Sequence, residues 1–141
     1  MAERPLWLID IDGTVALRDG RGPYDWDRVG EDVPNRPVVA VVRSLIAAGY
    51  PIAYVSGRPE RCRRQTEMWL RANVGRPDAV EGLWMRRNGD RRKDTVVKRE
   101  IFTQHFGNRE VMGVIDDRES VVRMWRDELG LTVLQCAEGR F

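Results

Sequence analysis

Two aspartates separated by one residue follow an apolar run near the start of the chain. The run at residues 6–9 (LWLI) predicts a buried strand, and the motif DIDGT comes next at residues 10–14. Because alternate residues of a strand point to the same face, Asp10 and Asp12 can approach one target together while Ile11 faces the core. Paired carboxylates suit nucleophilic attack, acid/base catalysis or a divalent metal. The alternative is a polar turn without chemistry, because Asp and Gly are ordinary turn residues.

A second segment ends in groups that bind phosphate. The apolar, β-branched run at residues 51–55 is followed by Ser56, Gly57 and Arg58. Their hydroxyl, bare backbone amide and guanidinium stand before a predicted helix. This arrangement is typical of a phosphate cradle at a helix N-terminus.

Two later segments supply a lysine and a second acidic pair. A predicted helix starts at Asp94 and carries Lys98 on its next turn. For Asp94, a plain helix cap is as good an interpretation as a role in the site. The apolar run at residues 111–115 predicts another buried strand, which ends in Asp116 and Asp117.

The elements that must position these groups alternate between strand and helix. Apolar stripes with helical spacing comprise Val38, Val41, Val42, Leu45 and Ile46; Cys62, Thr66, Trp69 and Leu70; and Val121, Val122, Trp125 and Leu129. Because strands that return through a helix pair in parallel, we expect an α/β fold with a mostly parallel sheet and helices on both faces. The expected strands are residues 6–12, 51–56, 111–116 and 131–136. Ligands bind at the carboxyl ends of such strands, where the motifs fall.

The composition fits one globular domain over residues 1–141. A length of 141 residues with 42% hydrophobic content suffices for one core and is too small for two domains. No segment is long and apolar enough to span a membrane, and the N-terminal apolar run is too interrupted for a secretory signal, so we expect a cytoplasmic protein. Cys62 and Cys136 are expected to remain reduced thiols in or near the core.

In this order, the four motifs resemble those of the haloacid dehalogenase (HAD) superfamily of aspartyl phosphatases, over nearly the whole chain. Longer segments are similar to the 3′-phosphatase domain of phage T4-type polynucleotide kinase/phosphatase. These segments are GRGPYD at residues 20–25, VSGR at 55–58, RKDTVVKREIF at 92–102, IDDR at 115–118, VRMWR at 122–126 and GRF at 139–141. The resemblance implies a HAD-like (Rossmannoid) fold with a minimal cap and a phosphatase that acts on nucleic-acid ends.

The residue types predict two chemical roles for the first motif. Asp10 would attack phosphorus and form an aspartyl-phosphate, while Asp12 would protonate the leaving oxygen and later accept a proton from the hydrolytic water. The resemblance implies Mg²⁺ held by Asp10, Asp116 and the backbone carbonyl of Asp12. Asp117 is either a further ligand, directly or through water, or a group that orients the ligands.

Other residues of the motifs are predicted to bind the substrate phosphate. Ser56, the Gly57 amide and Lys98 would hold its non-bridging oxygens. Asp94 would orient Lys98, and Thr14 of the first motif is placed among the substrate-binding residues. Because the net charge is only +2, composition alone does not imply nucleic acid.

The arginines are nevertheless unevenly placed. Arg58 and, by resemblance, Arg21 would grip the substrate phosphate or its neighbour, and Arg86, Arg87 and Arg92 are expected to join Arg58 in binding phosphates farther upstream. The clusters are Arg58, Arg61, Arg63 and Arg64, and Arg86, Arg87, Arg91, Arg92 and Lys93. The alternative is that both clusters are solvated faces.

The short chain leaves room for only a small cap. The segments that could form one are residues 18–37, expected to be a long loop, and residues 73–93. Trp26, in the first of these segments, is interpreted as loop packing, with stacking on a base as the alternative. A site covered so little would admit a polymer end.

The sequence therefore predicts a Mg²⁺-dependent phosphatase that removes the terminal 3′-phosphate from DNA or RNA ends in nucleic-acid repair. The alternatives are a nucleotidase acting on free 5′- or 3′-mononucleotides, and a catalytically weak HAD-like nucleic-acid-binding module. The module would require loss of a catalytic residue, and none is lost. Because the chain has no P-loop motif, it is either a free-standing phosphatase or a domain excised from a longer protein, and a kinase or ligase partner in trans is one expectation. No membrane partner is expected, and a homodimer is left open.

Overall fold

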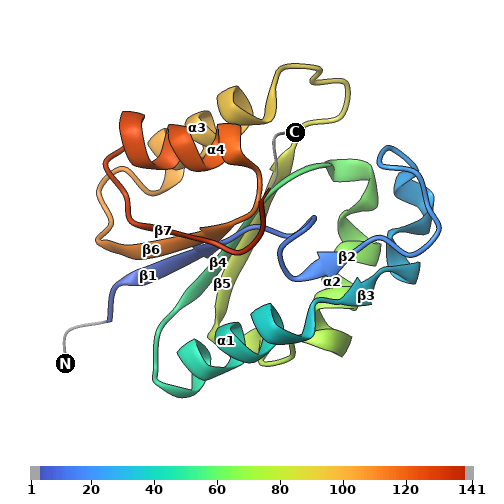
Figure 1. Ribbon diagram of the computed structural model, residues 1–141, viewed down its shortest axis with the longest axis horizontal. Helices are drawn as coiled ribbons and strands as arrows, with labels where there is room; N and C mark the ends of the chain where they lie inside the picture. The colour runs from blue at the N-terminus through green and yellow to red at the C-terminus, as the bar shows by residue number, and fades with distance from the viewer. Residues whose placement is uncertain (1–3, 139–141) are drawn as a thin grey trace.

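A five-stranded parallel sheet forms the centre of the molecule (Figure 1). The computed structural model describes residues 4–138, so the GRF segment at residues 139–141 lies outside the described residues. The strand order is β5-β4-β1-β6-β7, and every neighbouring pair is parallel. The strands are β1 (Leu6–Ile9), β4 (Ile52–Pro59), β5 (Val80–Arg86), β6 (Val111–Asp116) and β7 (Val133–Gln135).

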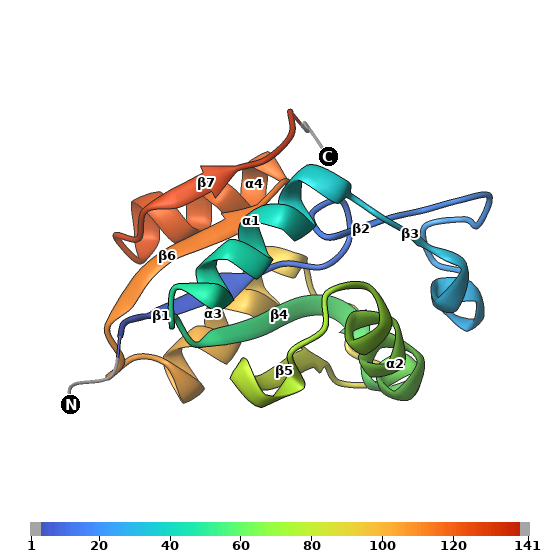
Figure 2. The ribbon, with the colours of Figure 1, turned by 90° about the horizontal axis from the view of Figure 1, so that it is seen from below.

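Helices cover both faces of this sheet, as predicted (Figures 1 and 2). The helices α1 (Arg36–Ala47) and α2 (Arg63–Asn73) pack with one buried cluster of apolar side chains. On the opposite face, a second cluster is covered by α3 (Asp94–His105), α4 (Glu119–Arg123) and the π-helical turn η4 (Met124–Glu128). The stripe of Cys62, Thr66, Trp69 and Leu70 is buried as expected, and in the last stripe Leu129 alone is half-buried. On α1, Val39 is buried in place of Val41, which is exposed.

One strand was not predicted. Residues 80–86 were assigned to a segment available for a cap, yet they form β5 and pair with β4, with Leu83 opposite Tyr54 and Trp84 opposite Val55. Glu81 and Gly82 interrupt the apolar alternation, and both residue types are weak strand formers. Pairing with β4 overrides this weak local preference.

The expected loop at residues 18–37 contains short ordered elements and pairs with the two residues before it. The strands β2 (Ala16–Leu17) and β3 (Val33–Pro34) form an antiparallel ribbon, and the 3-10 helix η1 (Trp26–Glu31) lies between them. Two further 3-10 turns, η2 (Glu60–Cys62) and η3 (Pro77–Ala79), flank α2. The ribbon and η1 extend beyond the carboxyl end of β1, away from the N-terminus (Figure 2).

Both cysteines are free thiols, as expected; Cys62 is buried and Cys136 is half-buried. None of the helices between residues 4 and 138 combines the length and the hydropathy that a bilayer crossing needs.

Candidate active site

The first motif forms a tight turn directly after β1. The Asp10 amide donates to the Ile115 carbonyl oxygen at 3.0 Å, which ties the turn to the neighbouring strand β6. Ile11 is fully buried, as its place between the two aspartates predicts. Gly13 has φ +77°, and a Cβ there would overlap the Asp117 carboxylate. Glycine is therefore required for the first motif to lie against the last one.

Three carboxylates and one ammonium meet beneath this turn. Asp10, Asp116 and Asp117 are buried and offer oxygen atoms within 4.8 Å of one another. Lys98 Nζ donates to Asp10 Oδ1 at 2.7 Å and to Asp116 Oδ2 at 3.0 Å. Trp125 Nε1 also donates to Asp116 Oδ2, at 3.1 Å. Sequence motifs up to 107 positions apart, from Asp10 to Asp117, thus converge on one buried group.

This buried group carries more negative than positive charge. Three carboxylates face one ammonium, which leaves two negative charges without compensation inside the group. Burial raises the pKa of Asp10 well above its usual range, Asp116 adds to the increase, and Lys98 opposes it. Burial likewise raises the pKa of Asp117. Burial alone would lower the pKa of Lys98, but Asp10 and Asp116 outweigh it and raise that pKa, so the ammonium stays charged.

Oxygen ligands and excess negative charge are what a divalent hard cation requires. The three carboxylates therefore fit Mg²⁺ by their chemistry. The Asp12 side chain is not a member of this cluster; the prediction for Asp12 involved its backbone carbonyl.

The Asp12 carboxylate is instead clamped by two arginines. Arg58 donates to both of its oxygens, at 2.9 and 3.0 Å, and Arg21 donates to Oδ1 at 3.0 Å. Burial raises the pKa of Asp12, but the hydrogen bonds and charges of Arg58 and Arg21 outweigh burial and lower it overall. The side chain remains 37% exposed and lines the cavity described below.

A second carboxylate, Asp32, binds both of these arginines. It accepts hydrogen bonds from Arg21 at 2.7 and 2.9 Å and from Arg58 at 2.8 Å, with all three side chains fully buried. Sequence reasoning missed Asp32, because it lies outside every motif. No local sequence pattern points to it.

The two arginines do not line the cavity, although both were predicted to bind substrate. Arg58 is 0% exposed and Arg21 is 4% exposed. Their guanidinium groups are occupied by Asp12, Asp32 and, for Arg58, the Thr66 hydroxyl at 3.0 Å. In this geometry they act on Asp12, and a direct contact with substrate stays a prediction.

Other predicted substrate-binding residues lie close to the acidic group. The Thr14 hydroxyl donates to Asp10 Oδ2 at 2.8 Å. Ser56 is fully buried, and its Oγ accepts from the Arg58 amide at 3.1 Å. Gly57 lines the cavity, and a Cβ there would overlap the Asp94 carboxylate. Of these three positions, Gly57 is the one open to a ligand.

Asp94 is not a plain helix cap. It is the first residue of α3, and the N-cap position is occupied by Lys93. Instead, it binds Arg86 through Oδ1 and Arg118 through Oδ2, the latter at 2.7 Å. It was expected to orient Lys98, but the hydrogen bonds of Lys98 go to Asp10 and Asp116. Asp94 therefore links the ends of β5 and β6.

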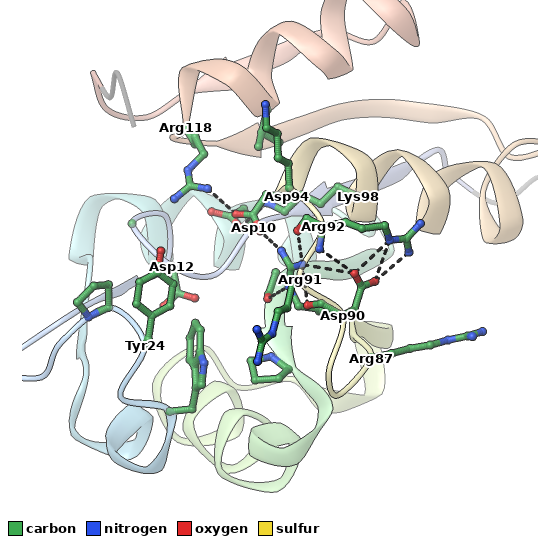
Figure 3. Close-up of a pocket in the computed structure, with 18 of the residues that line it drawn as sticks. Asp10, Asp12, Tyr24, Arg87, Asp90, Arg91, Arg92, Asp94, Lys98 and Arg118 are labelled. Atoms are coloured by element: carbon green, nitrogen blue, oxygen red, sulfur yellow. Dashed lines mark hydrogen bonds and ion pairs between the residues drawn. The ribbon is translucent and has the colours of Figure 1, made fainter.

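These groups open into one cavity of about 790 Å³ (Figure 3). Asp10, Asp12 and Lys98 line it, and the two loops at residues 18–26 and 87–93 supply much of its walls. The exposed side chains of Arg61 in η2 and of Arg87 and Arg91 in the second loop also line it. Within residues 4–138, no ion pair engages these three arginines, whereas Arg86 and Arg92 are paired with carboxylates. The cavity thus joins the acidic group to exposed arginines.

A family model described as "Polynucleotide kinase PNKP phosphatase domain" matches residues 4–141. The chain belongs to this family. Its HAD-type fold and its motifs identify it as a phosphatase of the polynucleotide kinase/phosphatase type.

Similar proteins support this assignment. A "Putative bifunctional polynucleotide kinase/RNA ligase" of Autographa californica nuclear polyhedrosis virus is 37% identical over 123 residues, which is 85% of this chain and 17% of that protein. A chain in the "Pnkp1/Rnl/Hen1 RNA repair complex" matches with a TM-score of 0.90 and 34% identity, over 100% of this chain and 46% of that one. This chain therefore spans less than half of each of these relatives.

A more distant structure shows the fold alone. The D,D-heptose 1.7-bisphosphate phosphatase from B. bronchiseptica matches with a TM-score of 0.60 and 13% identity, over 94% of this chain and 80% of that one. The HAD-like arrangement of the sheet is thus shared beyond the polynucleotide family.

Proposed function

We propose that this chain removes the terminal 3′-phosphate from DNA or RNA ends, with Mg²⁺ as cofactor and through an aspartyl-phosphate intermediate. The observation that carries the proposal is the cavity itself. Asp10 and Lys98, both buried, line the cavity, and so do the exposed side chains of Arg61, Arg87 and Arg91. A small phosphomonoester needs only the buried group, whereas a polynucleotide end brings further phosphates to the arginines.

Asp10 is the nucleophile in this proposal. One of its oxygens binds Lys98 and the other accepts from Thr14, which fixes the carboxylate toward the cavity. In-line attack on phosphorus forms the aspartyl-phosphate and releases the ribose oxygen. Lys98 has three N–H donors and uses two of them on Asp10 and Asp116. The third is available for a phosphoryl oxygen, beside the amide of Gly57.

Asp12 transfers the protons. The lowered pKa of Asp12, caused by Arg58 and Arg21 acting against burial, makes it a carboxylate that can accept a proton from the hydrolytic water. Donation to the leaving oxygen requires a higher pKa. The negative charge of a bound phosphate supplies this increase, because a nearby like charge disfavours the ionised form.

Asp10, Asp116 and Asp117 would hold the Mg²⁺. When bound, it keeps Asp10 ionised and withdraws charge from the phosphoryl oxygens. Burial is the first cause of the raised pKa values of Asp10 and Asp117, and a cation beside these carboxylates would favour their ionised forms.

We also propose that the phosphatase works beside kinase and ligase activities. The relatives named above include a putative kinase/ligase and a component of an RNA repair complex. A ligase joins a 3′-hydroxyl end, so removal of a 3′-phosphate would prepare its substrate. The 141 residues would form one HAD-like domain of such a system.

The test compares phosphate release from a 3′-phosphorylated oligonucleotide, its 5′-phosphorylated counterpart of the same sequence, and a 3′-mononucleotide. We expect the 3′-phosphorylated oligonucleotide to give the highest kcat/KM, and the activity to disappear with a chelator and return with Mg²⁺ or Mn²⁺. Equal kcat/KM for the mononucleotide and the oligonucleotide would favour a nucleotidase. Full activity in excess chelator, with no metal carried over, would refute the Mg²⁺ requirement.

A further inference from the structure

An exposed aromatic ring stands at the wall of the catalytic cavity. Tyr24 is 80% exposed, yet it lines the same cavity as Asp10 and Asp12. Figure 3 shows its ring on the Asp12 side of the cavity. A ring this exposed contributes little to folding, whereas its apolar face and hydroxyl suit binding to a partly aromatic ligand.

The loop around Tyr24 is ordered. The Asp25 amide donates to the Gly22 carbonyl oxygen at 3.1 Å and closes a turn that contains Pro23 and Tyr24. Proline restricts the backbone of this turn. The ring therefore projects from a defined turn.

Trp26 connects this ring to the acid/base residue. The rings of Tyr24 and Trp26 lie edge to face, with centroids 6.3 Å apart and planes at 76°. Trp26 is half-buried and packs against the core, which confirms the loop-packing interpretation. The Arg21 guanidinium lies 5.7 Å from the Trp26 centroid and also binds Asp12. Because Trp26 covers at most one face of the Tyr24 ring, the other face is open to a ligand.

The opposite wall of the cavity is cationic. Arg87 and Arg91 come from the loop at residues 87–93, and no ion pair engages either side chain within the described residues 4–138. An aromatic wall facing a cationic wall matches the two parts of a nucleotide, a flat base and a phosphate. The volume of about 790 Å³ lies within the range of sites that enclose an organic molecule, which is far more than a phosphate ion needs.

We propose that Tyr24 is a stacking platform for the base of the terminal nucleotide, the one whose 3′-phosphate lies at Asp10. This inference rests on the proposed function and adds a residue that selects for a base-bearing end. Because every base has a π-face, stacking on Tyr24 accepts any of them and favours an unpaired end, whose terminal base is free to stack.

The test uses 3′-phosphorylated oligonucleotides with and without a base on the terminal nucleotide. We expect Tyr24→Ala to lower kcat/KM on the base-bearing substrate by about 5- to 100-fold, which corresponds to the loss of one base–aromatic stack. Tyr24→Phe keeps the ring and should stay within about twofold of wild type. Removing the base should lower the kcat/KM of wild type by a similar factor. It should leave the kcat/KM of Tyr24→Ala unchanged. Met68→Ala is the matched control, because Met68 is exposed on α2 and does not line the cavity.

The stacking role would be overturned by wild-type kcat/KM for Tyr24→Ala on the base-bearing substrate, or by a Tyr24→Ala loss that persists when the base is absent. A Tyr24→Phe variant as weak as Tyr24→Ala would also overturn it, since the hydroxyl would then be the active group. Anisotropy of a 5′-fluorescein, 3′-phosphorylated oligonucleotide bound to Asp10→Asn protein, with and without Tyr24→Ala, separates the two proposals. If wild type releases no phosphate while Tyr24→Ala still weakens oligonucleotide binding, the proposed phosphatase function is refuted and the stacking role of Tyr24 is supported. If wild type and Tyr24→Ala release phosphate equally well, the stacking role is refuted and the proposed phosphatase function is supported.

Discussion

At the scale of single residues, the proposed chemistry depends on Asp10. Its carboxylate binds Lys98 at 2.7 Å and Thr14 at 2.8 Å, so asparagine can occupy the same space and keep part of these contacts. Asn is not a nucleophile toward phosphorus. We therefore expect Asp10→Asn to fold and to lose roughly 10³-fold or more in turnover. Phosphate release and a circular dichroism spectrum measure both properties. A folded variant that keeps more than a few per cent of wild-type turnover would exclude Asp10 as the nucleophile.

The excess of negative charge predicts a pH-dependent stability without metal. Burial raises the pKa of Asp117, so the folded state binds more protons than the unfolded state above the usual carboxyl range. Stability in a chelator should then fall as pH rises toward the folded pKa. Asp117→Asn cannot ionise. Its Tm should exceed that of wild type by a few degrees at neutral pH, and this difference should shrink as pH falls.

With Mg²⁺ the order should reverse, because the cation offsets the repulsion and binds wild type more tightly. Thermal unfolding of both proteins at several pH values, in chelator and in Mg²⁺, measures these differences. A Tm difference that is the same at every pH in chelator would contradict the charge argument.

The sequence predicted which residues meet at the site, but it did not predict which partner each arginine binds. Asp10, Lys98, Asp116 and Asp117 converge as expected, because strand ends of a parallel sheet share one edge. The positions of the guanidinium groups could not be predicted. Whether an arginine faces a ligand or a buried carboxylate depends on a distant partner such as Asp32, which no local pattern reveals.

At the scale of elements, one glycine controls how closely α3 approaches β4. Gly57 lies beside the Asp94 carboxylate, and a Cβ would come 2.5 Å from Asp94 Oδ1. Gly57→Ala should push Asp94 away from Arg86 and Arg118. We expect a destabilisation of roughly 1–3 kcal/mol from overpacking and about a 100-fold loss of activity from misplaced groups.

Gly30→Ala is the matched control for this prediction, because no atom lies within 4 Å of a Cβ at Gly30. Denaturant unfolding and steady-state kinetics of the two variants give the comparison. If Gly57→Ala behaves like Gly30→Ala, the close approach to Asp94 does not matter.

The elements were predictable where one pattern dominated. The four expected strands were found, and β6 has the predicted bounds, Val111–Asp116. The predicted end of the first strand at residue 12 was wrong: β1 ends at Ile9, because the chain turns at the first motif. By contrast, β5 is an edge strand with a mixed pattern, and only its pairing with β4 makes it a strand. The ribbon of β2 and β3 was also missed, because these strands have two residues each, too few for any periodicity.

At the scale of the whole molecule, the charge distribution matters more than the net charge of +2. Four arginines were expected to bind phosphates upstream of the scissile one. Of these, Arg58 is buried away from the cavity, and Arg86 and Arg92 are held by carboxylates. Arg87 is exposed on the cavity wall, with Arg91 on the same loop. We therefore propose Arg87 and Arg91 as the residues that contact the polynucleotide.

Replacing both Arg87 and Arg91 with Ala should then weaken long substrates selectively. If each contacts one upstream phosphate of a single strand, the slope of log kcat/KM against log salt should become shallower by about 0.7 per arginine, since fewer counterions are released. A 3′-mononucleotide has no upstream phosphate, so its kcat/KM should change far less. Arg86→Ala should behave differently. Arg86 donates to the Gly57 carbonyl oxygen at 2.9 Å and binds Asp94, so its loss should impair substrates of every length.

Arg64→Ala is the matched control for the loss of charge, because Arg64 is exposed on α2 and does not line the cavity. Kinetics on one-, three- and six-nucleotide 3′-phosphorylated substrates at several salt concentrations distinguish the variants. An unchanged salt slope in the double variant, or an equal loss on mononucleotide and hexanucleotide, would remove the assignment of Arg87 and Arg91. A slope that changes as much in Arg64→Ala would show that the effect comes from overall charge. The expected result is a gain in kcat/KM with length that depends on the 87–93 loop and declines with salt, because the arginines act only when a second phosphate reaches them.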